Sequence, residues 1–340
     1  MATPAGQTKP NPEFIFETLN AYHRTAALKA GIELDVFTAI GEGARTADAL
    51  AKRCKADARA MRILCDYLVI MGFLSKQDGQ YALTSDSSLF LDRRSPSCFA
   101  SAVGFLTHPD LMAMYQDLTA VVRKGGRVKE GDGMADPDNP IWIEFARSMA
   151  PLQAFPAQSV AEILNAQAGE KWKVLDIAAG HGMYGVTIAK LNPNAEIYAL
   201  DWPRVLEVAK ENARKAGVEK RLHTLPGNAF EVDFGTGYDI VLITGFLHHF
   251  DPPTNEKFLR KVQAALTPNG RAVTVEFIPN EDRVTPPVVG AFSMVMLGST
   301  HAGDAYPFSE YERMFRNAGF HSNEHASLPA GPQSVIISRK

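Results

Sequence analysis

A glycine-rich turn near the middle of the chain is the first place where the sequence offers a ligand site. The run from Val174 to Gly182 reads Val-Leu-Asp-Ile-Ala-Ala-Gly-His-Gly, an apolar strand that enters a turn before a helix. Gly180 and Gly182 lack a Cβ, so the backbone can approach a bound molecule closely. With Gly185 they also spell Gly-x-Gly-x-x-Gly, which in dinucleotide-binding proteins places a pyrophosphate at a helix N-terminus. The glycines alone therefore indicate a nucleotide cofactor of either kind.

Asp176 favours one of the two kinds of cofactor. It places a carboxylate inside the expected strand, where a dinucleotide site usually has an apolar residue. A methionine ammonium is attracted by a nearby negative charge, whereas a pyrophosphate is repelled by it. No partner sequence for hydride transfer is apparent either. These features favour S-adenosylmethionine over NAD.

Further polar residues follow the next strands. Asp201 closes the second expected strand, about 20 residues beyond the glycine turn, where a carboxylate can accept both ribose hydroxyls. A helix N-cap is the alternative for Asp201, because Pro203 follows at a first-turn position. An ordinary loop is the alternative for the adenine site that we expect after the third strand, where an amide and a backbone N–H are available. Asn228 supplies this amide and Ala229 this N–H, and the other expected cofactor residues are Trp202 and Thr244.

His248 is the candidate general base. Methyl transfer from a sulfonium is an in-line displacement, so the protein must align the acceptor and remove a proton from an acceptor hydroxyl. A phenol has a pKa of about 10, and an imidazole titrates near neutral pH. A histidine that only shapes the pocket is the alternative. A metal site at His248, His249 and Asp251 is a poor fit, because adjacent side chains after a strand diverge.

Alternating strands and helices are expected to position these residues. We predict a long helix from Ile141 to Leu164, interrupted at Pro151 and Pro156, and after it a parallel, doubly wound, Rossmann-like α/β sheet with ligands at the carboxyl ends of its strands. The predicted strands are Val174 to Ala178, Glu196 to Leu200, Leu222 to Leu225, Asp239 to Thr244, Ala272 to Phe277 and Ser334 to Ser338.

The first third of the chain predicts a separate, mostly helical domain. Helical spacing runs from Phe14 to Leu34, Thr46 is a candidate N-cap, and a helix from 58 to 71 ends before Gly72. Asp78-Gly79 then predicts a tight hairpin turn, and together these features indicate a winged helix. A helix-like run lies near 111–122, and polar, Gly/Pro-rich stretches that include 132–140 surround it. We predict a winged-helix-like domain over 1–108 and a cofactor-binding domain over 109–340.

Composition limits the classes of function. The formal net charge of -3 provides no global basic field for nucleic acid or an anionic membrane. No apolar stretch is long enough for a membrane span, and the first residues lack the apolar core of a signal peptide. The three cysteines, Cys54, Cys65 and Cys98, have no paired spacing. A cytoplasmic protein that handles small molecules is expected.

Several motifs in order support a specific resemblance. The chain resembles the small-molecule O-methyltransferase family of plants and bacteria, which includes caffeic acid and hydroxyindole O-methyltransferases. The resemblance spans nearly the whole chain and implies an N-terminal dimerisation domain. It rests on Val174 to Gly182, Asp201-Trp202-Pro203, Gly227-Asn228-Ala229-Phe230, Phe246-Leu247-His248-His249-Phe250 and Ala318-Gly319-Phe320.

The resemblance also implies residue roles. His248 matches the family's catalytic histidine, although His249 replaces the acid that usually follows it, and Glu276 matches the glutamate that orients the histidine. The position of a second orienting glutamate holds Ala305, and Asp304 beside it is a candidate substitute. The residues that match the substrate pocket are Phe145, Met149, Phe292 and Met296, for which ordinary core packing is the alternative, and Trp142 is compatible with either surface.

Two rival functions remain open at this point. Some relatives of the family use bound S-adenosylmethionine for other chemistry, and the altered positions His249 and Ala305 are compatible with that. A winged helix is also typical of transcriptional regulators. Residues 45–76 hold seven basic and three acidic side chains, and the helix at 58–71 is too apolar to lie in a DNA groove. We therefore expect a homodimer formed by the N-terminal helices and no nucleic-acid partner.

Overall fold

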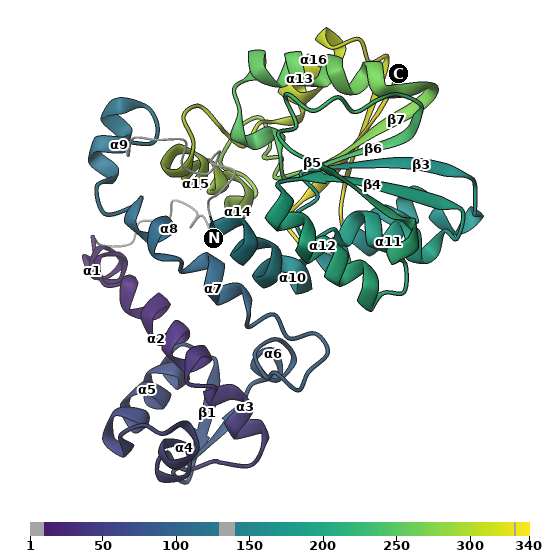
Figure 1. The fold of residues 1–340 in the computed structure, drawn as a ribbon. Helices are drawn as coiled ribbons and strands as arrows, with labels where there is room; N and C mark the ends of the chain where they lie inside the picture. The colour runs from purple at the N-terminus through teal and green to yellow at the C-terminus, as the bar shows by residue number, and fades with distance from the viewer. Residues whose placement is uncertain (1–9, 129–139, 330) are drawn as a thin grey trace. The chain divides into compact units, whose positions relative to one another are not determined.

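The computed structural model describes residues 10–128, 140–329 and 331–340, which form two compact units, Met1–Thr107 and His108–Lys340. The first unit is mostly helical, with one short two-stranded sheet (Figure 1). Its elements are α1 (Glu13–Leu19), α2 (Tyr22–Glu33), α3 (Val36–Gly41), α4 (Ala47–Cys54), α5 (Ala58–Ile70), β1 (Leu74–Gln77), β2 (Gln80–Leu83), α6 (Ser85–Phe90) and α7 (Ala102–Leu106).

The helix cap and the hairpin turn expected in the first unit are both present. The Thr46 side chain accepts a hydrogen bond from the Ala49 N–H and caps α4. Asp78 and Gly79 both have positive φ angles, 50° and 76°, as a primed hairpin turn requires. The run of helical spacing from 14 to 34 forms two helices, α1 and α2. At the break, the Asn20 side chain donates to the Phe16 carbonyl and competes with the helical hydrogen bonds.

The second unit is built on a seven-stranded sheet in the order β5-β4-β3-β6-β7-β9-β8. All its strands run parallel except β9, which is antiparallel to both neighbours. Its strands are β3 (Trp172–Ile177), β4 (Ala195–Asp201), β5 (Leu222–Pro226), β6 (Tyr238–Thr244), β7 (Leu266–Glu276), β8 (Ser322–Ser327) and β9 (Ser334–Arg339). The predicted Rossmann-like doubly wound sheet is confirmed.

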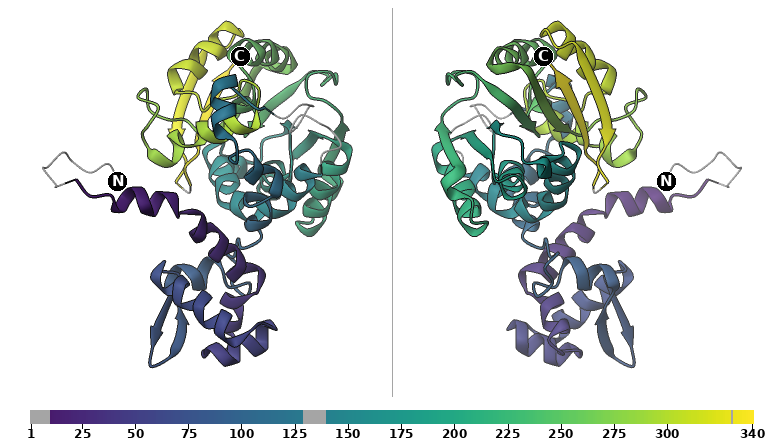
Figure 2. Two further views of the ribbon diagram at one scale, coloured as in Figure 1. Left: turned by 90° about the vertical axis from the view of Figure 1, so that its left-hand side faces the viewer. Right: turned by 90° about the vertical axis from the view of Figure 1, so that its right-hand side faces the viewer.

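Helices cover both faces of this sheet (Figures 1 and 2). One face packs against α10 and α11, and the other packs against α13 and α16, each through its own apolar core. The helices of this unit are α8 (Pro109–Ala113), α9 (Leu118–Lys124), α10 (Ile141–Ile163), α11 (Met183–Leu191), α12 (Pro203–Lys215), α13 (Pro252–Ala265), α14 (Pro287–Gly290), α15 (Phe292–Ser299) and α16 (Phe308–Asn317), with short 3-10 turns η2 (Ala166–Ala168), η3 (Glu219–Arg221) and η4 (Leu247–His249).

Two predicted elements differ from the structure, and one strand was not predicted. The helix α10 continues through Pro151 and Pro156, because its second half is held by buried contacts of Ala157 and Val160 with the sheet core. The helix-like run at 111–122 is two helices, α8 and α9. The strand β8 was not predicted, because its residues are mostly exposed and offer no apolar alternation. Most of the polar stretch 132–140 lies outside the described residues.

Within residues 10–128, 140–329 and 331–340, no helix has the length and apolarity that crossing a bilayer requires.

Candidate active site

The glycine turn joins β3 to α11 and contains three residues in left-handed backbone, of which the first is Ala178 with a φ of 51°. Gly180 has a φ of 57° and Gly182 a φ of 70°, a region that favours glycine. A Cβ at position 182 would lie 2.9 Å from the Cβ of Ala209 on α12. The turn is therefore packed against α12, and its backbone leaves no room for a side chain at Gly182.

Asp176 lies beneath this turn, in the last part of β3. It is buried, and its Oδ2 accepts a hydrogen bond of 3.1 Å from the Gly185 N–H in α11. Its Oδ1 makes no hydrogen bond within the described part of the chain. Burial raises the pKa of Asp176 to about 7. An unpartnered buried carboxylate oxygen fits a neighbouring cation and disfavours a pyrophosphate.

Asp201 ends β4 and connects two backbone segments of the site. Its Oδ2 accepts a 2.7 Å hydrogen bond from the Gly180 N–H, and its Oδ1 accepts one of 2.7 Å from the Trp202 N–H. The alternative of a helix cap at Asp201 is wrong, because Trp202 occupies the N-cap position of α12. Burial raises the pKa of Asp201 to about 6. Each carboxylate oxygen keeps a lone pair for a ribose hydroxyl.

The turn after β5 carries Asn228 and Ala229, for which adenine contacts are expected. The Asn228 Oδ1 accepts from the Phe230 N–H at 3.0 Å, and its Nδ2 donates to Glu231 at 3.2 Å. The Asn228 side chain thus closes its own loop, as the ordinary-loop alternative states. Ala229 is buried beside it, and its carbonyl accepts from the Lys261 ammonium at 2.9 Å. On the neighbouring strand β6, Thr244 is the last residue and is half-buried.

A buried carboxylate organises the turn that carries His248. Glu276 ends β7 with no exposed surface, and its Oε1 accepts from the N–H groups of Phe246, Leu247 and His248 at 3.0, 2.9 and 3.4 Å. Its Oε2 lies 2.5 Å from the His248 Nδ1. The structure therefore brings the two expected catalytic residues together. With Nδ1 donating to Glu276, Nε2 is the nitrogen that remains to accept a proton.

Aromatic rings surround the His248 imidazole on the side of α15. The ring of Phe292 meets it edge-on, with centroids 4.9 Å apart at an angle of 85°. Phe292 also stacks on Phe277, with centroids 4.0 Å apart. Met296 lies one helical turn further along α15 and is buried. Phe292, one of the two pocket residues expected on α15, therefore contacts His248, and Met296, the other, lies one turn further along the same helix.

A second group of rings connects residues 246–250, which we call the histidine turn, to the glycine turn. Trp142 of α10 contacts His249 edge-on at 5.9 Å and Phe145 at 5.8 Å. Phe145 in turn stacks on His181 at 6.2 Å, inside the glycine turn. Met149 is half-buried one turn further along the helix. These contacts place Trp142 and Phe145 between the two turns, which favours the pocket over ordinary core.

His181 and His249 were not predicted as site residues. His181 lies between the rings of Phe145 and Tyr184, and burial lowers its pKa to about 4. Burial and the neighbouring His248 also lower the pKa of His249 well below its usual value. Both imidazoles are therefore neutral near pH 7. Their positions inside the two motifs were the only signal in the sequence, because their ring contacts come from distant α10.

Asp304 does not take the place of a second orienting glutamate. Its carboxylate forms an ion pair with Arg283 at 2.9 Å, and only its backbone N–H contacts the histidine turn, through the His248 carbonyl at 3.0 Å. Ala305 beside it is buried. The carboxylate that acts on the imidazole ring of His248 is therefore Glu276.

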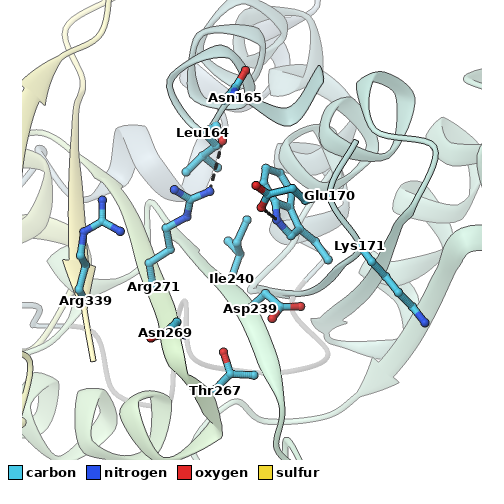
Figure 3. A pocket seen from close by; sticks show the side chains of 11 residues that line it. Leu164, Asn165, Glu170, Lys171, Asp239, Ile240, Thr267, Asn269, Arg271 and Arg339 are labelled. Carbon is cyan, nitrogen blue, oxygen red and sulfur yellow. Dashed lines mark hydrogen bonds between the residues drawn. The ribbon is translucent and has the colours of Figure 1, made fainter. Parts of the chain in front are cut away.

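A pocket of about 410 Å³ lies at the opposite edge of the sheet (Figure 3). Trp172, Asp239 and Thr267 line it from the first residues of β3, β6 and β7, so it opens at the amino ends of the parallel strands. Arg271 spans it and donates to the Leu164 carbonyl at 3.2 Å. The pocket is thus separated by the length of the strands from the glycine and histidine turns.

Replacing Gly182 by Ala tests how closely the glycine turn is packed. The added Cβ would occupy left-handed backbone and lie 2.9 Å from Ala209, so the turn must shift. We expect cofactor affinity, measured by calorimetry, to fall at least 10-fold, whereas Gly217→Ala, also at positive φ but with open space around it, leaves it within about 2-fold. Equal affinities for the two variants would contradict this packing argument.

Comparisons with known proteins agree with this geometry. A model of the O-methyltransferase domain matches residues 115–321, and a model of the O-methyltransferase dimerisation domain matches residues 16–93. The solved structure of a putative O-methyltransferase from Nostoc punctiforme is 50% identical, with a TM-score of 0.93, and the match covers 98% of this chain and 100% of that one.

Two further relatives extend the comparison. A 3-hydroxy-5-methyl-1-naphthoate 3-O-methyltransferase from Streptomyces sahachiroi is 25% identical over 94% of this chain and 93% of its own. Human N-acetylserotonin methyltransferase, solved with S-adenosylmethionine, is 20% identical and shares the fold, with a TM-score of 0.84 over 98% of this chain and 99% of that one. Since the O-methyltransferase domain model covers more than half of it, the chain belongs to the S-adenosylmethionine-dependent O-methyltransferases.

Proposed function

We propose that this enzyme methylates a hydroxyl group on a flat aromatic or polyketide-like acceptor, with His248 as the general base. The observation that carries the proposal is the 2.5 Å contact of the His248 Nδ1 with the buried Glu276, among aromatic rings at the carboxyl edge of the sheet. The naphthoate relative acts on an aromatic acceptor by its name, which supports the same class here.

The chain's own residues account for the acid–base chemistry. When bound, S-adenosylmethionine supplies a methyl group on a positively charged sulfur. Glu276 fixes the His248 ring and stabilises the imidazolium that forms when Nε2 takes the proton of the acceptor hydroxyl. Proton removal leaves an oxygen with the negative charge that displacement requires. Phe292 and Met296 on one side, and Phe145 and Met149 on the other, would hold the acceptor ring and exclude water.

Removing the proposed base separates catalysis from binding. His248→Ala should lower kcat by about 100-fold or more, since general-base catalysis contributes roughly 10²–10⁴, while cofactor affinity stays within about 2-fold. Transfer of a labelled methyl group to a panel of phenols measures the first, and calorimetry the second. His321→Ala, at an exposed position, is the matched control. An unchanged kcat in His248→Ala would show that His248 is not the general base. A product methylated only on carbon would contradict the proposed methylation of a hydroxyl group.

The same panel tests the other S-adenosylmethionine chemistry considered above. Tight cofactor binding by the wild-type enzyme without transfer to any acceptor would favour that alternative. The presence of the base and its orienting carboxylate in one hydrogen-bonded pair supports methyl transfer.

The cofactor site is proposed from the residues around the glycine turn. Asp176 and the turn of Gly180 and Gly182 would receive the methionine part, and Asp201 the ribose hydroxyls. Trp202, which packs against the same apolar cluster as Trp142, the loop of Asn228 and Ala229, and Thr244 at the end of β6 would enclose the remainder.

The raised pKa values of two carboxylates predict a pH dependence of cofactor binding. A cation and two ribose hydroxyls bind best to ionised carboxylates, so binding must release the protons that Asp176 and Asp201 hold below pKa values of about 7 and about 6. The Kd for S-adenosylmethionine should therefore fall as pH rises from 5.5 to 7.5. Calorimetry at each pH measures this.

Asp176→Asn is the matched variant for this experiment, because it keeps an oxygen for the Gly185 N–H and removes the charge. We expect weaker binding with a smaller dependence on pH. A Kd that is constant across this range in the wild-type enzyme would show that neither carboxylate titrates against the cofactor.

The N-terminal unit is proposed to be a winged-helix-like dimerisation domain within residues 1–108, with the catalytic domain at 109–340. The helix α1 has no buried residue, and its apolar side chains Phe14, Ile15, Phe16 and Leu19 are 60–76% exposed. Such a surface fits an interface between two copies of the chain, as the dimerisation model over 16–93 also suggests. We further propose a cytoplasmic location, consistent with three cysteines that form no disulfide.

Light scattering tests the proposed homodimer. The wild-type enzyme should have twice the chain mass of 37.1 kDa at micromolar concentration. Phe14→Asp combined with Leu19→Asp should yield monomers, because two charges would be buried in the interface. Lys29→Ala, which removes a surface ion pair with Glu33, is the control. A stable wild-type monomer would contradict the proposal.

A further inference from the structure

A second segment of the chain donates hydrogen bonds to carbonyl groups of the histidine turn, whereas Glu276 accepts from its N–H groups. We call Thr300–Tyr306 the rear segment. Its Asp304 N–H donates to the His248 carbonyl at 3.0 Å, and its Tyr306 hydroxyl donates to the Phe250 carbonyl at 2.7 Å. The packing is so close that a Cβ at Gly303 would lie 2.2 Å from the His248 carbonyl oxygen. Glu276 thus holds the N–H groups of the turn, and the rear segment holds the His248 carbonyl and shares the Phe250 carbonyl with the Asn255 side chain on α13, which also donates to the Leu247 carbonyl.

One arginine anchors the rear segment. The Arg283 Nη1 lies 2.9 Å from the Asp304 carboxylate, and its Nη2 lies 2.7 Å from the carboxylate of Glu310 on α16. A guanidinium can contact two carboxylates at once because its donors form a planar fork. Arg283 therefore connects the rear segment to a helix that is itself packed in the sheet core through Tyr311 and Met314.

The loop that carries Arg283 is held by its own hydrogen bonds. The Asn280 N–H donates to the Thr285 carbonyl at 2.7 Å, and the Asp282 carboxylate accepts from the N–H groups of Val284 and Thr285. Arg283 itself has a φ of 60°, a left-handed conformation that non-glycine residues rarely adopt.

We propose that Arg283 is a positioning residue for His248. By fixing Asp304, it holds the backbone carbonyl behind the base and so sets where the imidazole meets the acceptor hydroxyl. This inference rests on the proposed role of His248. The ion pairs are partly exposed and add little to stability, so their effect should be seen in catalysis rather than in folding.

Arg283→Ala should lower kcat by about 5- to 10-fold, since small misplacements of a catalytic group are costly, while the cofactor Kd and the melting temperature change little. Arg283→Lys should recover part of the rate, because one ammonium keeps the charge but loses the fork. Arg316→Ala is the matched control, since Arg316 forms a 2.9 Å pair with Glu312 on α16 and does not contact the rear segment. An unchanged kcat in Arg283→Ala overturns the inference.

Hydrogen exchange gives a readout that does not depend on activity. In Arg283→Ala, the backbone N–H groups of residues 246–250 should exchange at least 3-fold faster than in the wild-type enzyme, and those of β3 at the same rate. Unchanged exchange at 246–250 overturns the inference, even if wild-type methyl transfer is confirmed. A wild-type enzyme that methylates no hydroxyl instead overturns the proposed function. The exchange rates at residues 246–250 still show in that case whether Arg283 holds the turn. Should Arg283→Ala fail to fold, Asp304→Asn removes the same ion pair and is judged by the same two measurements.

Discussion

The site depends on one buried carboxylate. Glu276 has no exposed surface, so its charge must be compensated by donors from the protein. Those donors are three consecutive backbone N–H groups and the His248 ring, all from the turn after β6. The requirement to satisfy this carboxylate therefore determines both the path of the turn and the orientation of the imidazole. An apolar residue at position 276 would leave three backbone N–H groups and the His248 Nδ1 without this acceptor.

The order of the strands brings the two halves of the site together. β3 and β6 are neighbours in the parallel sheet, with Asp176 opposite Leu242 in register. The glycine turn leaves the carboxyl end of β3 and the histidine turn leaves that of β6, so both lie at the same edge. The rings of Trp142 and Phe145 then bridge the two turns. The regions proposed for the cofactor and the acceptor thus adjoin because of the strand order.

Much of this arrangement could be predicted from the sequence. Apolar runs ending in Asp, Gly or His identified the central strands and the residues at their ends. The pairing of Glu276 with His248 came only from the family resemblance, because nothing in the local sequence shows that β6 and β7 are adjacent. The strand β8 was missed because it has no apolar face, and the continuity of α10 was missed because its packing overrides two prolines. Arg283 gave no signal, since its partners Asp304 and Glu310 are 21 and 27 residues away.

The helix α10 has two distinct halves. Its first turns carry Trp142, Phe145 and Met149, whereas its later turns bury Ala157, Val160 and Ala161 in the sheet core. The side chains that would touch an acceptor are thus mounted on an element whose position is set elsewhere. Substitutions at Trp142, Phe145 and Met149 can alter the shape offered to an acceptor, because the helix keeps its buried contacts through Ala146, Ala157 and Val160. Such a division lets a lineage explore new acceptors while retaining its fold.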